Sequence, residues 1–196
     1  MKRLILVRHG LTDWNEDGRL MGRHEVELNE RGREQARRVA KELSTLSVTA
    51  VYASPQIRAQ QTAAPLAELL KTRVIVEAAF DEVWLSSEWQ GKTVDELRGD
   101  AELERVIADP MYRSESLEPI AAVQIRTTAA VERFRKRHTD GRVVIFSHGD
   151  PLRAISAHYL GMPLAQFRRL GCENGSMTIF DFNKRGPRLA LSNWQP

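Results

Sequence analysis

The sequence predicts an α/β fold: a three-layer sandwich with a mostly parallel central sheet, helices on both faces, and a short helical lid insertion. Short apolar runs rich in branched side chains, typical of buried strands, alternate with longer segments of helical periodicity. The chain has 196 residues, which fits one domain with a modest insertion. We therefore expect a single domain over residues 1–196, with the lid insertion at about 80–120.

The first predicted elements are a strand, a long helix and a second strand. Residues 2–7 (KRLILV) form an apolar run that predicts a buried strand. Asn29 is a helix-capping type, and the helix that it begins should run to about Leu46. Apolar residues recur in this helix at helical spacing, with arginines on the opposite side. Residues 49–53 (TAVYA) predict the second strand.

A helix and a third strand should follow. Ser54 is a capping type and Pro55 suits the first helical position, so we expect the helix to begin there. Pro65 should kink or divide this helix, because proline removes an N–H and its ring meets the preceding turn. Residues 73–78 (RVIVEA) predict the third strand.

The second half begins with a segment that has little periodicity. Residues 80–120 are predicted to be a mostly helical excursion from the main fold. A helix over about 121–137 should precede the clearest strand of the chain, 143–147 (VVIFS). Pro151 should open a further helix that runs through about Leu160.

The last two apolar segments predict an antiparallel pair of strands. MTIFDF and RLALS lie on either side of Arg185 and Gly186, a pair that suits the turn between them. Strands that alternate with helices over the preceding residues favour α/β layers around a largely parallel sheet.

The composition narrows the class of protein. The hydrophobic content of 42% and the charged content of 28% are ordinary for a globular chain. No apolar run approaches the roughly 20 residues of a membrane span. The single cysteine, Cys172, excludes an intrachain disulfide and fits a reducing compartment. We therefore expect a cytoplasmic protein that does not bind membranes.

The net charge of +3 favours a small anionic partner. The densest basic cluster lies on one predicted helix, without the interleaved aromatic residues of a nucleic-acid binder. Histidine and cysteine residues lack zinc spacing, and the segment that follows His24 does not match the His-Glu-x-x-His motif. We expect no nucleic acid, no metal and no cofactor, and a monomer or homodimer.

Similar residues occur where three of the predicted strands end. Ligands of such sheets bind outside the carboxyl ends of the strands. The first strand leads into Arg8 and His9, the clearest strand leads into His148, and Arg58 lies one turn into the helix after the second strand. Arginine forks match phosphate oxygens and neutral imidazole can attack phosphorus. These residues predict a phosphate site, with His9 at the rim of the sheet and not in the core.

Five motifs, in order and over nearly the whole chain, resemble those of the histidine phosphatase superfamily, specifically its phosphoglycerate mutase-like branch. They are LVRHGLTDWN (6–15), SPQIRAQQTA (54–63), EWQGKT (88–93), VVIFSHGDPLRA (143–154) and ENGSMTIFDF (173–182).

The resemblance implies roles for several residues. His9 matches the histidine that becomes phosphorylated, and Arg8, Arg58 and His148 match residues that hold the phosphoryl group. Asn15 matches a further phosphate contact. The glycines Gly22 and Gly149 would bring the backbone close to the substrate.

The acid that protonates the leaving group is placed less directly. The family has a glutamate shortly before its Trp-x-Gly segment, and Glu82 is the candidate for this role. Its spacing to Trp89 is one residue longer than the usual pattern, so Asp81 and Glu88 are alternatives.

Two departures from the family pattern affect substrate recognition. Met21 stands where many members have a polar side chain, so only the backbone could help there. The acid segment, WLSSEWQG, lacks a glycine that is common at that place. Trp14, Trp84 and Trp89 could form the wall of a pocket.

The sequence favours a phosphatase that hydrolyses small phosphomonoesters through a phosphohistidine on His9. A mutase must keep water away from its phosphohistidine, and mutases of this family resemble one another in a longer insertion and an asparagine where this chain has Asp150. The alternatives are a cofactor-dependent phosphoglycerate mutase, or a non-catalytic phosphate-binding protein on the same fold.

Overall fold

The computed structural model describes all 196 residues, and a six-stranded sheet forms its centre. The strand order is β3-β2-β4-β1-β5-β6. The first four strands of this order run parallel, and the β5–β6 hairpin joins the edge of β1, with β5 antiparallel to it. The strands are β1 (Arg3–Arg8), β2 (Val48–Ala53), β3 (Val74–Val76), β4 (Arg142–Ser147), β5 (Met177–Asn183) and β6 (Gly186–Trp194).

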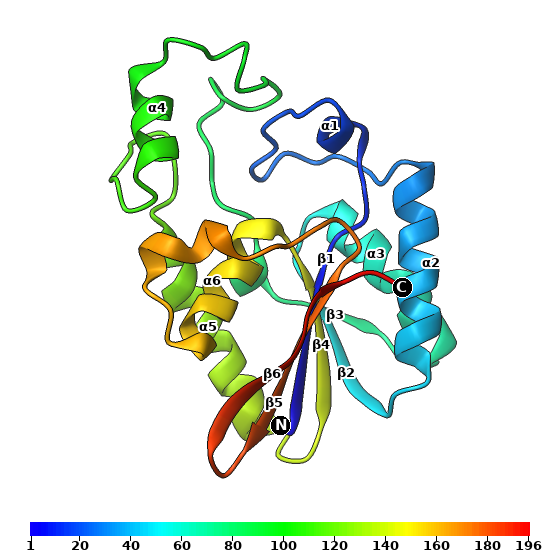
Figure 1. Ribbon diagram of the computed structural model, residues 1–196. Helices are drawn as coiled ribbons and strands as arrows, with labels where there is room; N and C mark the ends of the chain where they lie inside the picture. Colours follow the sequence, from blue (N-terminus) through cyan, green and yellow to red (C-terminus); the bar gives the residue numbers. More distant parts are fainter.

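Helices cover both faces of the sheet, which confirms the predicted three-layer fold (Figure 1). One face carries α2 (Glu30–Ser44) and α3 (Ile57–Leu69), and the other carries α5 (Ile120–Arg137) and α6 (Gly149–Leu160). The short helices α1 (Asp13–Glu16) and α4 (Ala101–Ala108) lie beyond the carboxyl ends of the strands, at the top of Figure 1. Two 3-10 helices complete the fold, η1 (Ala78–Phe80) and η2 (Leu164–Arg169). None of the helices is long and apolar enough to cross a membrane.

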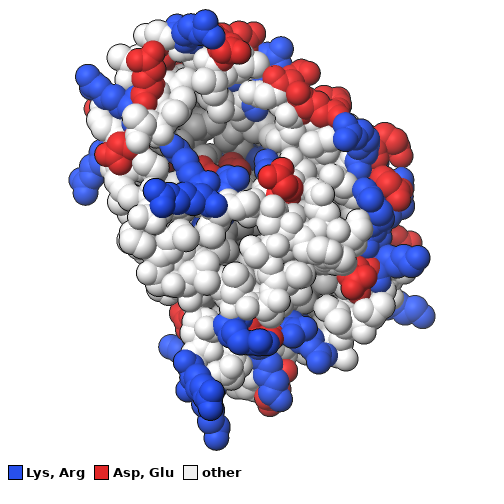
Figure 2. All heavy atoms as spheres, in the orientation of Figure 1, with Lys and Arg blue, Asp and Glu red and all other residues white.

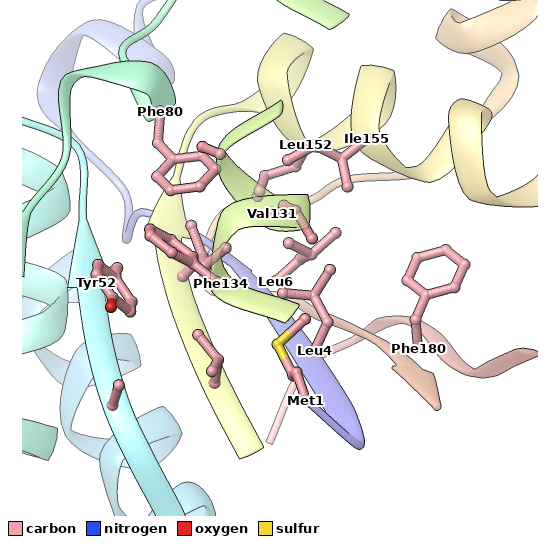
Figure 3. Close-up of a cluster of buried hydrophobic side chains, with 14 of the residues drawn as sticks. Met1, Leu4, Leu6, Tyr52, Phe80, Val131, Phe134, Leu152, Ile155 and Phe180 are labelled. Carbon is pink, nitrogen blue, oxygen red and sulfur yellow. The ribbon is translucent and has the colours of Figure 1, made fainter. Parts of the chain in front are cut away.

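The alternation of side chains along β1 divides the core into two layers. Leu4 and Leu6 face the α5 and α6 side, where they pack with Phe134 and Ile155 (Figure 3). Tyr52 belongs to this layer, and its ring stacks on Phe134 with 3.9 Å between the ring centroids. Successive strand residues point to opposite faces, so β1 contributes to both layers and is buried on both sides.

The opposite layer contains the other residues of the same strand. Ile5 and Val7 pack against Val39 and Leu43 of α2. Both helix residues belong to the apolar spacing that predicted this helix, and Asn29 caps it by accepting a hydrogen bond from the N–H of Gly32. The predicted helix and its cap are therefore confirmed.

Two helix starts differ from the sequence-based expectation. α3 begins at Ile57 with Gln56 as its N-cap, and not at Ser54 and Pro55. Ser54 still belongs to the sheet, because its N–H donates to the carbonyl of Phe146. Likewise α6 begins at Gly149, two residues before the expected Pro151.

The other boundaries are closer to expectation. Pro65 lies inside α3 and the helix continues through it, so of the two predicted effects, a kink or a division, the division does not occur. The third strand is confirmed but covers only Val74–Val76 of the expected six residues. The α5 helix and the terminal antiparallel pair are confirmed.

The lid segment contains less helix than the sequence indicated. Between η1 and α5 the only regular helix is α4, so the expectation of a mostly helical excursion is wrong. An apolar cluster and irregular contacts hold the rest in place, such as the hydrogen bond from Trp89 Nε1 to Asp100 and the bridge between Leu85 and Leu117. Such contacts depend on tertiary packing and leave no period in the sequence.

Candidate active site

The two histidines are brought together by the pairing of β1 with β4. Arg8 is opposite Ser147 in the parallel register, so the residues that follow them, His9 and His148, are neighbours. The N–H of His9 donates to the carbonyl of Ser147, and the two imidazole centroids are 5.2 Å apart. The prediction that both histidines lie at the same sheet edge agrees with this geometry.

His9 is more enclosed than a rim position suggests, with 1% of its surface exposed. Its Nδ1 lies 2.7 Å from the carbonyl oxygen of Gly10, so Nδ1–H donates to that oxygen in the neutral ring and Nε2 keeps its lone pair. Burial, followed by the charges of Arg58 and Arg8, holds the pKa of His9 well below its usual value. The imidazole is therefore neutral near pH 7.

Two guanidinium groups lie beside the histidines, that of Arg58 fully buried and that of Arg8 half-buried, and each is anchored through Nη atoms. Arg8 Nη1 donates to the carbonyl of Cys172 at 2.6 Å. Arg58 donates to the carbonyls of His24 and Gly22, both at 2.8 Å. The Nε atoms of both arginines are buried and have no partner. Anchoring fixes the two forks, while the buried Nε–H of each stays without a partner.

His148 is fixed by a residue to which sequence reasoning gave only a capping role. Its Nε2 lies 2.8 Å from Ser54 Oγ, and the Ser54 hydroxyl is 2.7 Å from Gln56 Oε1. Because the serine donates to the glutamine oxygen, it accepts from His148 Nε2–H. The opposite nitrogen, Nδ1, is buried without a partner. Ser54 could have been found from its place at the carboxyl end of β2.

Asn15 lies in a small polar network next to His9. It closes a capping box at the start of α1 with Thr12. Asn174 Nδ2 lies 3.1 Å from both Asn15 Oδ1 and the carbonyl oxygen of His9. Sequence reasoning noted an asparagine before the closing strand but gave it no role. Met21, the departure noted above, takes part through its sulfur, which lies 3.6 Å from the Thr12 hydroxyl.

Of the three candidate acids, only Glu82 lines the cavity beside His9. Burial and the nearby Asp150 charge raise the pKa of Glu82 to about 7, although the N–H of Val83 and the arginines act in the opposite direction. Asp81 instead lies 3.2 Å from the Ser54 hydroxyl, and Glu88 is exposed. The geometry therefore favours Glu82 over its two alternatives.

Two further arginines hold the backbone of Glu82. Arg23 Nε and Arg126 Nη2 donate to its carbonyl oxygen at 3.0 and 3.2 Å. Both guanidinium groups also donate to Glu118, at 2.9 to 3.0 Å. Glu118 in turn accepts from the N–H of Trp84. Nothing in the sequence pattern indicated this clamp, because its members are separated by up to 103 positions and have no common motif.

A cavity of about 270 Å³ opens between the sheet edge and the lid. The space-filling view shows a hollow there, flanked by basic and acidic side chains (Figure 2). Six of the predicted site residues line it: Arg8, His9, Asn15, Gly22, Glu82 and Gly149. Arg58 and His148 do not line it and are fully buried. No group of three or more histidine, cysteine, aspartate or glutamate side chains converges as a metal site would require.

The three tryptophans occupy different environments. Trp89 lines the cavity and is buried. Trp84 is 43% exposed, and Trp14 stacks on His24 with 4.8 Å between the ring centroids; neither lines the cavity. The expectation of a wall formed by all three tryptophans is therefore wrong for Trp14 and Trp84.

Relatives of this chain include both phosphatases and mutases. Phosphoserine phosphatase 1 of Hydrogenobacter thermophilus is 35% identical over 94% of this chain and 89% of the relative. A probable phosphoglycerate mutase GpmB of Photorhabdus laumondii is 30% identical over 99% and 90%. Among solved structures, a mycobacterial glucosyl-3-phosphoglycerate phosphatase in complex with VO3 has a TM-score of 0.89 at 29% identity, over 98% of this chain and 99% of that one.

The family model for the histidine phosphatase superfamily (branch 1) matches residues 4–195. That range includes every residue of the site, from Arg8 on the first strand to Asn174 before β5. The chain belongs to the histidine phosphatase superfamily, branch 1.

Proposed function

We propose that this chain is a phosphatase that hydrolyses small phosphomonoesters through a phosphohistidine formed on His9. One observation carries the proposal. Arg8 Nε, Arg58 Nε and His148 Nδ1 are buried beside His9 without hydrogen-bond partners. Buried polar atoms are normally paired, and a phosphoryl group bound next to His9 would supply acceptors for the two Nε–H groups. His148 Nδ1 carries the lone pair of the neutral ring, so it would donate to the same group only after taking up a proton.

The nucleophile in this proposal is Nε2 of neutral His9. The hydrogen bond from Nδ1 to Gly10 holds the ring in the required tautomer. Nε2 attacks phosphorus and forms a P–N bond while the P–O bond to the leaving group breaks. Arg8 and Arg58 stabilise the charge on the phosphoryl oxygens, and the N-terminus of α6 at Gly149 adds unpaired N–H groups.

Glu82 acts as the general acid and then as the general base. With a pKa of about 7 it is largely protonated at mildly acidic pH and about half protonated near pH 7, so it can give its proton to the leaving oxygen. The resulting carboxylate then takes a proton from water. The water oxygen attacks phosphorus, the P–N bond breaks, and inorganic phosphate and free His9 are released. Both protons are accounted for, and no redox partner is needed.

Two relatives favour hydrolysis as the outcome, since their names describe phosphatases. The mutase alternative is supported by the relative named as a probable phosphoglycerate mutase. Asp150, which lines the cavity next to the site, would repel an anionic acceptor such as phosphoglycerate. Hydrolysis is therefore the function that the site supports best.

The test is a panel of phosphomonoesters assayed for phosphate release, with isomerisation of 3-phosphoglycerate measured in parallel. Phosphate release from several esters supports the phosphatase. Isomerisation that exceeds hydrolysis would establish the mutase. No turnover of any ester, together with phosphate binding, would establish the non-catalytic alternative. The proposal includes activity without a divalent metal or cofactor, so a chelator should leave the rate unchanged. We also propose a cytoplasmic monomer or homodimer.

A further inference from the structure

The lid side of the cavity is walled by apolar side chains. Val83, Leu85 and Trp89 come from the segment after η1, and Leu103 and Val106 come from α4. All five side chains are buried, with at most 7% of their surface exposed. They also belong to the apolar cluster that packs the lid against α5 and α6. The wall is therefore fixed by the core of the lid.

Ile107 extends this wall to the mouth of the cavity. It lines the cavity next to Val106, but half of its surface is exposed. A ligand body in the cavity would cover this surface, and burial of apolar area is favourable by roughly 25 cal/mol per Å².

Each polar side chain of the outer wall has at least one partner within the protein, and the arginines keep further N–H donors. Trp89 Nε1 donates to Asp100 at 2.9 Å. Arg168 Nη1 donates to the carbonyls of Val106 and Ile107 at 2.8 and 3.1 Å. These bonds hold η2 to the end of α4.

The remaining arginines of the wall are also engaged. Arg153 donates to the carbonyl of Leu170 and pairs with Asp150 at 3.3 Å. Arg19 donates to the carbonyl of Gly91 at 2.7 Å. The side-chain acceptors among the lining residues are Asn15, Glu82 and Asp150, and the first two lie in the catalytic part of the cavity. The hydroxyl protons of a leaving group with several hydroxyl groups would lose hydrogen bonds to water and find few side-chain acceptors on the lid side.

We infer that the site takes phosphomonoesters of apolar alcohols or phenols, with the aryl or short alkyl body against the α4 wall. This inference rests on the proposed function. It separates the chain from relatives whose names describe phosphoserine or glucosyl-3-phosphoglycerate as the substrate. An apolar wall discriminates by contact area, so the preference over polar esters should be on the order of 10- to 100-fold in kcat/KM.

The first experiment compares esters whose leaving alcohols have similar basicity. Differences in kcat/KM then report contacts with the leaving group and not its intrinsic reactivity. The apolar probes are 2-phenylethyl phosphate and hexyl phosphate, and the polar probes are glycerol phosphate, phosphoserine and 3-phosphoglycerate. We expect the apolar probes to have the higher kcat/KM. Equal or higher kcat/KM for any polar probe overturns the inference, while the phosphatase assignment stands. Inactivity with every probe, and with nitrophenyl phosphate, overturns the proposed function itself.

The second experiment changes the wall where folding is least at risk. Ile107→Asn alters a half-exposed residue of α4, and Ile125→Asn is the matched control on α5, where Ile125 is 70% exposed and lies outside the cavity. We expect Ile107→Asn to lower kcat/KM for 2-phenylethyl phosphate about tenfold and to change that for glycerol phosphate less than twofold. The control should match the parent for both probes. Equal losses for both probes, or no loss for either, in Ile107→Asn overturn the assignment of this wall.

Discussion

Arg126 Nη2 lies 3.2 Å from the backbone carbonyl oxygen of Glu82 and donates a hydrogen bond to it. The same guanidinium donates to the carbonyl of Ala79 and to both carboxylate oxygens of Glu118. One side chain of α5 thus fixes the backbone within the 3-10 helix η1, at Ala79, and just after it, at Glu82. The carboxyl group of Glu82 therefore has a defined position although it lies on a loop.

Glu118→Gln should weaken this clamp, because a neutral amide holds Arg23 and Arg126 less strongly than a carboxylate does. We expect kcat for alkyl phosphates to fall on the order of tenfold. Nitrophenyl phosphate, which needs little protonation of its leaving group, should be affected less. A merely structural defect would lower both rates together. Glu132→Gln, which removes a carboxylate paired with Arg135 elsewhere on α5, is the control and should match the parent.

Glu82→Gln should separate good from poor leaving groups more sharply. Loss of a general acid typically costs 10²- to 10⁴-fold in rate. For alkyl phosphates we expect the rate to fall by about 10²-fold or more. Nitrophenyl phosphate should retain most of its rate. The alkaline decline of kcat/KM near pH 7 should disappear in the variant. Glu88→Gln and Asp81→Asn are matched controls, and a selective loss in either would move the acid to that residue.

The raised pKa of Glu82 also affects stability. The carboxyl titrates at about 7 in the folded chain and near 4.5 when unperturbed, so the native state binds this proton more tightly. The stability that the protonated Glu82 carboxyl gives the native state is fully present below about pH 4.5 and is lost as the pH rises through 7. Glu82→Gln should therefore raise the Tm relative to the parent more at pH 8 than at pH 5. An equal difference at both pH values would contradict the shifted pKa.

His9→Ala should abolish turnover of all esters, because it removes the group that forms the covalent intermediate. The expected label from a radioactive phosphate donor is acid-labile and located on His9 in the parent. The side chain is buried in a polar setting, so the far-UV circular dichroism spectrum of the variant should match that of the parent. Label on another residue, or substantial turnover by the variant, would falsify the nucleophile assignment.

Ser54→Ala should lower the rate for alkyl and nitrophenyl phosphates alike, on the order of tenfold, by releasing the orientation of His148. This uniform loss distinguishes it from variants that affect the acid. Ser86→Ala removes a buried hydroxyl without a hydrogen-bond partner and is the matched control. If Ser54→Ala retains the parent rate with both esters, the bond to His148 Nε2 does not contribute to catalysis.

The fold could be predicted where periodicity carries the information. The continuous apolar run Leu4–Val7 records burial on both faces of β1, and the apolar stripe of α2 records which side of that helix faces the core. The lid could not be predicted in this way, since an apolar cluster without a regular period and irregular contacts such as Trp89 with Asp100 hold it. The α3 helix begins later than predicted because Ser54, the expected capping residue, forms a hydrogen bond with His148 instead.

The site was predictable where the position at a strand end coincided with a distinctive residue type. His9, His148 and Arg8 follow from that rule alone. The roles of Glu118 and Arg126 could not be predicted. An acidic residue just before a helix and a basic residue within it usually form a solvent-exposed ion pair. Only the three-dimensional contact with the carbonyl of Glu82 distinguishes them.

The central place of β1 affects how the protein folds during synthesis. β1 is made first, but its two neighbours in the sheet are β4 and β5, which follow more than 130 residues later. Contacts between distant segments form slowly, because a long loop must close before they contribute. A ribosome must therefore release most of this chain before β1 can pair on either side. The apolar β1 strand stays unpaired until then, which makes the nascent chain a natural client for chaperones that shield exposed strands.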